Sequence, residues 1–317
     1  MEGVYLGCGG VYLVREGAGL VIDPFFSNQK FGRIGSSVFF NRKTFRSEKR
    51  MVELGLKAMD KVTQNEKVNL RAILSAHSHY DHLMDIPAVY QHYNRNPSVL
   101  LSKSGYNIVH HVIDSTDIII NEAHMSTPSS AENPVRIPLE NGAAINVYPI
   151  LADHNPHFKN IKFFSGAQTT PSQELRHPFQ KTRANLWLEG RTFSFLIDYV
   201  DPAGEIEYRV FIQSSSCNAP AGIPPEVLRG RKVDLAFIGV VSYGFSPGYP
   251  CTLLEAIDPD HIIWVHWEDF FRRYSRKPKT VRGTDLPGFF DIECVKENSN
   301  KGYILAPRVK FSMLGQQ

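Results

Sequence analysis

The sequence predicts a mixed α/β (α+β) fold in which two β-sheets pack together and helices cover their outer faces. The chain opens with two apolar segments, residues 3–14 and 18–24, which are joined by a short turn and indicate an antiparallel hairpin. Each half of the chain then passes from strand-rich sequence into strand–helix units. A doubly wound parallel sheet would alternate strand and helix from the start, so the hairpin argues against that fold.

Length and composition fit a globular protein with a large core. The chain has 317 residues, of which 42% are hydrophobic and 21% are charged, and these values exclude a disordered, collagen-like or coiled-coil protein. No apolar run reaches the roughly 18–20 residues that are needed to span a bilayer. We expect one domain, residues 1–317, with loop insertions near residues 28–67 and 155–182.

The first half continues with helices and strands after the hairpin. Apolar residues recur at helical spacing between residues 48 and 62, which predicts a helix there. The same patterns predict further helices and several short strands: helices at 85–94 and 103–112, and strands at 69–75, at 117–120, at 143–151 and before residue 102.

The second half begins with a long loop, residues 155–182, which is rich in Pro, Gly and Ser. Helical turns are expected near residues 225–229 and a helix near residues 251–257. Apolar and β-branched runs predict the strands of this half: 184–189, 192–198, 207–213, 234–240, 261–265, and short ones near 292–296 and 303–306.

Three histidines and an aspartate lie within the six residues His77-Ser78-His79-Tyr80-Asp81-His82. The whole chain holds 12 histidines, so this clustering is not expected by chance. The segment follows an apolar strand and precedes a helix, and in an extended turn His77 and His79 point the same way. Imidazole and carboxylate groups are ligands that zinc favours, so the segment predicts a metal site.

The HxHxDH order of this segment resembles the signature of the metallo-β-lactamase fold hydrolases. Residues 5–10 resemble the first strand of that family with its small-residue turn, and residues 19–24 resemble its second-strand motif. The resemblance runs along nearly the whole chain and implies a four-layer αββα sandwich. The wording of residues 77–83, HSHYDHL, is most similar to the branch that holds N-acyl-phosphatidylethanolamine phospholipase D and the ascorbate-phosphate lactonases.

The resemblance also implies a set of metal ligands. His154 ends the segment Ala152-Asp153-His154, which matches the third motif, and His266 stands at a predicted strand end like the histidine of the final motif. Asp23 would be the buried acid that orients the ligand loop. His157 is an alternative to His154. The implied set holds one metal ion by three histidines and a second by an aspartate and two histidines: His77, His79 and His154, then Asp81, His82 and His266.

The chain departs from the family at the aspartate that usually bridges the two metal ions. The matching strand is followed by Ser214, Ser215 and Ser216, with no acid among them, and Ser215 stands nearest the expected position. A hydroxyl group brings no charge and is a weaker ligand than a carboxylate. Asp198, at the end of the preceding predicted strand, is a candidate substitute, although such an aspartate is more often a turn or surface residue.

These residues predict a metal-dependent hydrolase that cleaves an ester or phosphoester bond. Zinc, as one or two ions, is the expected cofactor, with Mn or Fe as alternatives. Water bound to such an ion has its pKa lowered toward about 7, and Asp81 would act as the catalytic residue that orients this water or accepts its proton. Two alternatives stay open: a lactonase or amide hydrolase on the same site, and a metal-binding relative that lost catalysis with the bridging aspartate.

Two basic runs, residues 42–50 and 272–282, predict a small anionic substrate such as a phosphoester, if they border the site rather than form solvated loops. Four aromatic residues near the second run would form an apolar wall of the site or belong to the core: Phe270, Phe271, Phe289 and Phe290. The net charge of +3 and the short 155–182 loop give no reason to expect a nucleic-acid partner. The sequence carries no signal for an oligomeric state.

The four cysteines form no CxxC pair, so neither a disulfide framework nor a thiolate zinc site is expected. Cys8 and Cys217 fall in motif segments, and we expect them to pack in the core or to line the site. The first residues form a predicted strand without a charged region followed by a long apolar one, so no signal peptide is visible and a cytoplasmic location is expected.

Overall fold

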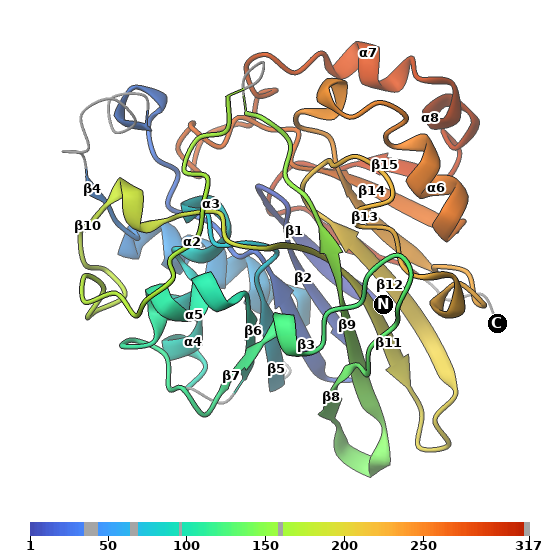
Figure 1. The fold of residues 1–317 in the computed structure, drawn as a ribbon, viewed down its shortest axis with the longest axis horizontal. Helices are drawn as coiled ribbons and strands as arrows, with labels where there is room; N and C mark the ends of the chain where they lie inside the picture. Colours follow the sequence, from blue (N-terminus) through green and yellow to red (C-terminus); the bar gives the residue numbers. More distant parts are fainter. Residues whose placement is uncertain (35–43, 64–68, 95–96, 158–160, 314–317) are drawn as a thin grey trace.

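The computed structural model describes residues 1–34, 44–63, 69–94, 97–157 and 161–313. Two seven-stranded sheets pack face to face, and one group of helices lies outside each of them (Figure 1). This arrangement confirms the predicted αββα sandwich. The helices outside the first sheet are α2 (Lys49–Asp60), α4 (Ile86–His92) and α5 (Lys103–Val109), and those outside the second are α6 (Cys251–Ile257), α7 (Leu286–Phe290) and α8 (Glu293–Glu297).

The first sheet has the strand order β16-β1-β2-β3-β5-β6-β7. Strands β16, β1, β2 and β3 pair antiparallel, and β3, β5, β6 and β7 pair parallel. Its strands are β1 (Glu2–Gly7), β2 (Gly10–Arg15), β3 (Ala18–Ile22), β5 (Asn69–Leu74), β6 (Ser98–Leu101), β7 (Ile118–Ile120) and β16 (Lys310–Ser312).

The expected single strand over residues 3–14 is wrong, because the chain turns at Cys8 and Gly9 into a hairpin. Gly7 and Gly9 have φ angles of 97° and 79°, and Cys8 between them has a φ of 53°. A run of three residues in the left-handed region cannot continue a strand, and glycine adopts this conformation at little cost.

The second sheet has the strand order β15-β14-β13-β12-β11-β9-β8. Because β11 pairs antiparallel with both β9 and β12, and β12, β13 and β14 pair parallel, the carboxyl ends of β9, β12, β13 and β14 lie at one edge. Its strands are β8 (Val135–Pro138), β9 (Ala144–Ala152), β11 (Thr192–Val200), β12 (Ile206–Gln213), β13 (Leu235–Gly239), β14 (His261–Val265) and β15 (Gly302–Ile304).

The core between the sheets follows the period of two that strands require. Phe193, Phe195 and Ile197 of β11 face the first sheet, whereas Leu196 packs outward under the helices of the second sheet. A separate apolar cluster joins the outer face of the first sheet to α2, α4 and α5. The central strands thus bury apolar side chains on both faces, which explains why these strands read as continuous apolar runs.

Two further segments differ from the sequence-based expectation. The strand expected at 184–189 is a 3-10 helix, η4 (Ala184–Leu186), and the short strand expected at 292–296 is the helix α8. Short apolar runs do not distinguish a strand from a buried helical turn.

Several short elements were not predicted. They are the strands β4 (Thr44–Phe45), β8, β10 (Thr182–Arg183) and β16, the helix α7, and the 3-10 helices η1 (Lys61–Thr63), η2 (Asn121–Ala123), η3 (Glu140–Gly142) and η6 (Tyr243–Phe245). The 3-10 helix η5 (Glu226–Leu228) was expected.

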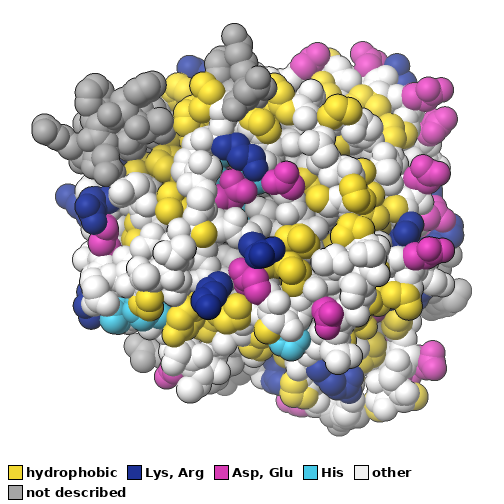
Figure 2. Space-filling model, in the orientation of Figure 1, with side chains coloured by type: hydrophobic (Ala, Val, Ile, Leu, Met, Phe, Trp, Pro, Cys, Tyr) yellow, Lys and Arg dark blue, Asp and Glu magenta, His cyan; other side chains and the backbone are white. Residues whose placement is uncertain are grey.

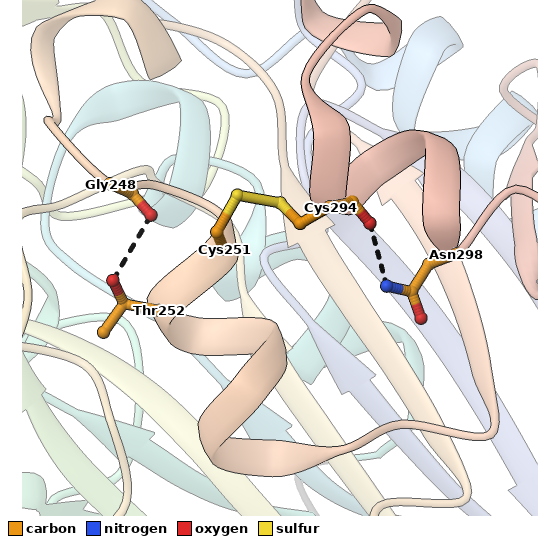
Figure 3. Close-up of a disulfide and its surroundings, with 5 residues drawn as sticks. All are labelled: Gly248, Cys251, Thr252, Cys294 and Asn298. Atoms are coloured by element: carbon orange, nitrogen blue, oxygen red, sulfur yellow. Dashed lines mark hydrogen bonds between the residues drawn. A yellow bond between two sulfur atoms is a disulfide. The ribbon is translucent and has the colours of Figure 1, made fainter.

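A disulfide joins Cys251 of α6 to Cys294 of α8 (Figure 3). This single bridge was not predicted, since the cysteine spacing indicated no disulfide framework. Its 43-residue separation gave no spacing signal, because the two residues meet only when the outer helices pack on the second sheet. Disulfides are typical of oxidising compartments, which weighs against the cytoplasmic location, and that location stays a prediction.

The two expected loop regions differ in content. The region 28–67 holds α2 and β4, and residues 35–43 and 64–68 lie outside the described residues. Before β10, the described part of 155–182 contains no helix and no strand, as expected for a long loop. None of the helices in the described part of the chain combines the length and the hydropathy of a membrane-spanning segment.

Candidate metal centre

The HxHxDH segment lies directly after β5 and leads into the short helix α3 (Tyr80–Leu83). His79 has an extended backbone and is the residue before the first turn of α3, so the chain changes direction within the segment. The other predicted ligand histidines follow β9 and β14 at the carboxyl edge of the second sheet. The fold therefore brings three chain segments together at one end of the sandwich.

His77, His79 and His154 form the first group of donor atoms. Nε2 of His77 lies 2.9 Å from Nδ1 of His79, and all three residues offer donor atoms within 4.8 Å of one another. Nδ1 of His154 lies 2.7 Å from the carbonyl oxygen of Asn155, which fixes that ring and leaves Nε2 for a ligand. The structure thus brings together the three residues of the first predicted ligand set, and their role as ligands stays a prediction.

Cys8, Asp81 and His266 form the second group of donor atoms. The sulfur of Cys8 lies 3.5 Å from Oδ2 of Asp81 and 3.7 Å from Nε2 of His266. Asp81 and His266 belong to the second predicted set, whereas Cys8 was not predicted as a ligand. His82 lies next to this group, with Nε2 3.7 Å from Oδ2 of Asp81.

Asp23 contacts both the backbone before the HxHxDH segment and a side chain within it. It follows β3 with a φ of 45°, and its Oδ1 accepts a hydrogen bond of 2.8 Å from the backbone nitrogen of Ala76. Its Oδ2 lies 2.9 Å from Nδ1 of His82 and accepts a hydrogen bond of 2.9 Å from the Ser214 hydroxyl. A carboxylate that holds the second nitrogen of an imidazole is a common partner of histidine ligands.

Burial and neighbouring charge set the protonation of these groups. Burial, followed by the adjacent imidazoles, holds the pKa of four histidines well below the usual range, so they are neutral and able to bind a metal: His77, His79, His154 and His266. The pKa of His82 is raised instead: burial lowers it, but the carboxylates of Asp23 and Asp81 more than offset that effect.

The donor atoms of this region fit a divalent metal ion. Neutral imidazoles, a carboxylate and a thiol converge from separate strands, and their residues are almost completely buried except for His154. Nε2 of His82 is buried and has no hydrogen-bond partner among the described residues. A buried ring nitrogen without a partner is costly unless something else binds it.

The three serines after β12 take different positions. Ser214 bonds to Asp23, Ser216 donates to the carbonyl oxygen of Val241, and Ser215 lines the pocket next to the histidines. Asp198 is not brought to this region. Its two carboxylate oxygens bind the Arg209 guanidinium at 2.7 and 2.8 Å on the outer face of the second sheet, so Asp198 is a buried ion-pair residue.

A buried carboxylate connects the first turn of the chain to the segment after β14. Glu268 accepts hydrogen bonds from the Tyr5 hydroxyl, at 2.6 Å, and from the backbone nitrogen of Cys8. The backbone nitrogen of His266 in turn donates to the Tyr5 hydroxyl at 2.9 Å. This network fixes Cys8 and His266 relative to each other, although 258 residues separate them.

A pocket of about 420 Å³ opens above the donor groups. Its lining includes His79, Asp81, His154 and His266, together with His157, whose ring stacks on that of His154. Its other walls are mostly apolar and include Ile34, Phe163, Phe164, Val241, Phe270 and Phe271.

Two of the four predicted wall residues, Phe270 and Phe271, are thus at the pocket. Phe289 and Phe290 instead pack against Trp264 on the outer face of the second sheet. Arg282 is the only lysine or arginine among the described residues that line the pocket.

Apart from Arg282, the basic run of residues 272–282 contributes no arginine or lysine to the described lining of this pocket. Arg272, Arg273 and Arg276 line a separate small hollow beside Glu268 and Pro307. On the face shown in Figure 2, basic and acidic side chains are interspersed rather than gathered into one basic patch. Residues 42 and 43 of the first basic run lie outside the described residues.

No protein-family model matches the chain, and no curated protein sequence is significantly similar to it. Several solved structures are similar to this chain. A metallo hydrolase, Igni18, from the archaeon Ignicoccus hospitalis superposes with a TM-score of 0.53 at 12% identity and covers 99% of both chains. A chain from Veillonella parvula described as "a possible metal-dependent hydrolase" gives a TM-score of 0.50 at 14% identity, again with 99% of both chains.

The diiron β-hydroxylase CmlA from Streptomyces venezuelae gives a TM-score of 0.52 at 15% identity, with 98% of this chain and 54% of CmlA covered. At these identities the likeness concerns the fold. The two mixed sheets, their outer helices and these neighbours show that the chain has the metallo-β-lactamase fold.

Sequence reasoning missed two residues of this region. Cys8 was expected to pack in the core or to line the site and not to bind a metal, because its partners are far away in the chain, and Glu268 was not predicted. Cys8 lies in residues 5–10, which the resemblance had marked, and Glu268 lies two residues after His266. A polar residue beside a predicted ligand segment is the signal that could have singled them out.

Proposed function

We propose that the protein is a metal-dependent hydrolase that cleaves an ester or phosphoester bond. The observation that carries this proposal is the convergence of two groups of donor atoms beneath one pocket. Zinc suits the histidines, carboxylate and thiol of these groups best, and Mn or Fe are alternatives.

The residues have distinct roles in this proposal. His77, His79 and His154 hold one ion, and Asp81, His82 and His266 hold a second, with Asp23 orienting the His82 ring. A bound divalent ion supplies a water of lowered pKa, toward about 7, and polarises the bond to be cleaved. Asp81 lines the pocket, so its carboxylate is placed to orient the attacking water or to accept its proton.

The residues that line the pocket indicate the polarity and charge of the substrate. Because most of the lining is apolar, we infer that the substrate carries an apolar or aromatic group beside the scissile bond. Arg282 is the group that would favour an anionic substrate such as a phosphoester. The other arginines of this loop that line the separate hollow would not contact a substrate in this pocket.

A second candidate is a lactone or amide hydrolase. The predominance of apolar lining favours an uncharged carbonyl substrate over a phosphoester, and the same ligands serve either chemistry. The similarity of the HSHYDHL segment to the branch with both a phospholipase and lactonases is compatible with either bond. A third candidate, a metal-binding protein without catalysis, differs from both by the absence of turnover.

The test is a panel of aryl esters, phosphodiesters, lactones and amides, assayed with zinc-loaded protein. We expect turnover of one class, its loss in a chelator and its return when zinc is added. His79→Ala should abolish this activity, whereas His110→Ala, a change at the end of α5, should leave it intact. Activity that persists in His79→Ala would contradict the proposed site, and zinc binding without turnover of any substrate would favour the non-catalytic candidate.

A further inference from the structure

We propose that the Cys8 thiolate is a ligand of the second metal ion, together with Asp81 and His266, and supplies the negative charge that a bridging aspartate would otherwise bring. The proposal rests on the proposed function, because it assigns a further ligand to the same site. It also gives a ligand role to the turn between β1 and β2, which the resemblance marked only as a small-residue turn.

The distances fit a single ion. With metal–sulfur bonds of about 2.3 Å and metal–nitrogen or metal–oxygen bonds of about 2.0 Å, the donor atoms of a tetrahedral site lie about 3.3–3.6 Å apart. The Cys8 sulfur lies 3.5 Å from Oδ2 of Asp81 and 3.7 Å from Nε2 of His266, and the last two atoms lie 3.9 Å apart. The edge from sulfur to Asp81 lies within this range, and the other two edges exceed it by 0.1 Å and 0.3 Å, so a small inward movement of the side chains would bring all three atoms onto one ion.

The charge of the site also calls for such a ligand. None of the residues 214–216, which match the position of the usual bridging acid, carries a charge, and Asp198 is bound to Arg209 elsewhere. Asp81 alone would leave the second ion with one anionic ligand. When a divalent ion binds, the Cys8 S–H bond is replaced by a sulfur–metal bond and one proton passes to water, which adds the second negative charge.

The backbone holds the thiol in this place. Cys8 has a φ of 53°, a conformation that is uncommon for a residue with a side chain and that is found at functional sites. The next residue, Gly9, packs closely on Ser214, because a Cβ atom at Gly9 would lie 2.7 Å from the Cβ of Ser214. The backbone nitrogen of Cys8 is bonded to the buried carboxylate of Glu268. The turn thus fixes the sulfur against Asp81 and His266 before any ion binds.

A packing role would not require these neighbours. Cys217, the other free cysteine, is also buried, but its sulfur contacts the carbonyl oxygen of Ala221 and the side chain of Gln213 and belongs to neither donor group. Cys217 therefore serves as the matched control for Cys8.

The experiment loads the metal-free full-length protein with Co²⁺ and measures two quantities: the ions bound per chain after dialysis, and the near-ultraviolet charge-transfer absorption that a thiolate gives on cobalt. We expect two ions and a charge-transfer band in the wild type and in Cys217→Ser. Cys8→Ser should lose the band and retain about one ion, with an unchanged circular dichroism spectrum.

Two ions without a charge-transfer band in the wild type would overturn the proposal, and this result needs no folded variant. A band that survives in Cys8→Ser would overturn it as well. Both results leave the hydrolase intact if zinc-dependent turnover is present. No bound ion in the wild type would overturn the proposed function together with this ligand.

Discussion

Nδ1 of His82 lies 2.9 Å from Oδ2 of Asp23, and both side chains are completely enclosed by the protein. The pair joins the end of β3 to the first turn of α3, 59 residues further along the chain. Because Asp23 also binds the backbone of Ala76 just before the ligand segment, one carboxylate fixes both the backbone and a ring of the metal centre.

Asp23→Asn should weaken metal binding by about 10- to 100-fold, the usual effect of removing a partner of a histidine ligand. Asparagine preserves the size of the side chain and tolerates the positive φ of this position. The measurement is competition for zinc with a chelator of known affinity. Asp201→Asn, at the exposed turn after β11, is the control, and equal zinc affinity in both variants would contradict the role of Asp23.

Acidification should destabilise the metal-free protein. Four histidines have a pKa far below their ordinary value of about 6.5, so each takes up a proton when the chain unfolds below that pH: His77, His79, His154 and His266. Their contribution to stability is full above about pH 7 and falls as the pH decreases through 6.5. His82 has a raised pKa and therefore adds stability as the pH falls, which offsets the effect of about one of these four histidines.

We therefore expect the free energy of unfolding to drop between about pH 7 and pH 5.5 by more than about 1.4 kcal/mol per pH unit, the slope of a single histidine. Glu268, whose raised pKa adds stability as the pH falls, opposes part of this effect. Urea unfolding of chelator-treated protein measures the slope. A free energy that is constant over this range would show that the histidines are not buried in the neutral form.

The disulfide between Cys251 and Cys294 should stabilise the helices outside the second sheet. Closing a loop with a sequence separation of 43 residues removes chain entropy from the unfolded state that is worth about 4 kcal/mol, and measured effects are commonly about 2–4 kcal/mol. Replacing both cysteines by serine should lower the free energy of unfolding in urea by that amount. The metal content should not change, because the disulfide lies outside the metal centre. A loss of bound metal would contradict this independence of the disulfide and the metal centre.

The apolar pocket should select substrates by their apolar group. In a series of substrates with the same scissile bond, each CH₂ group buried in the pocket should raise kcat/KM by about fourfold, the equivalent of about 0.8 kcal/mol. Phe270→Ala, which opens the pocket wall, should flatten this dependence, whereas Phe290→Ala, outside the second sheet, should not. A rate that is independent of chain length in the wild type would exclude this pocket as the binding site.

The fold and the first donor group were largely predictable from the sequence, because both depend on local patterns. His77 and His79 share one turn, and the strands that carry His154 and His266 are clear apolar runs. The remaining features depend on contacts between distant segments. Cys8 meets Asp81 only when the first sheet brings the turn between β1 and β2 beside the segment after β5, Asp198 is bound by an arginine on the neighbouring strand, and Cys251 pairs with a cysteine of another outer helix.

The most direct test of the account is the metal content of protein purified under metal-replete conditions, measured together with turnover. We predict two ions per chain, one for each donor group, and hydrolysis that is lost in a chelator and restored by the ions. Protein that folds, binds no ion under these conditions and is indifferent to a chelator would contradict the assignment of a metal-dependent hydrolase.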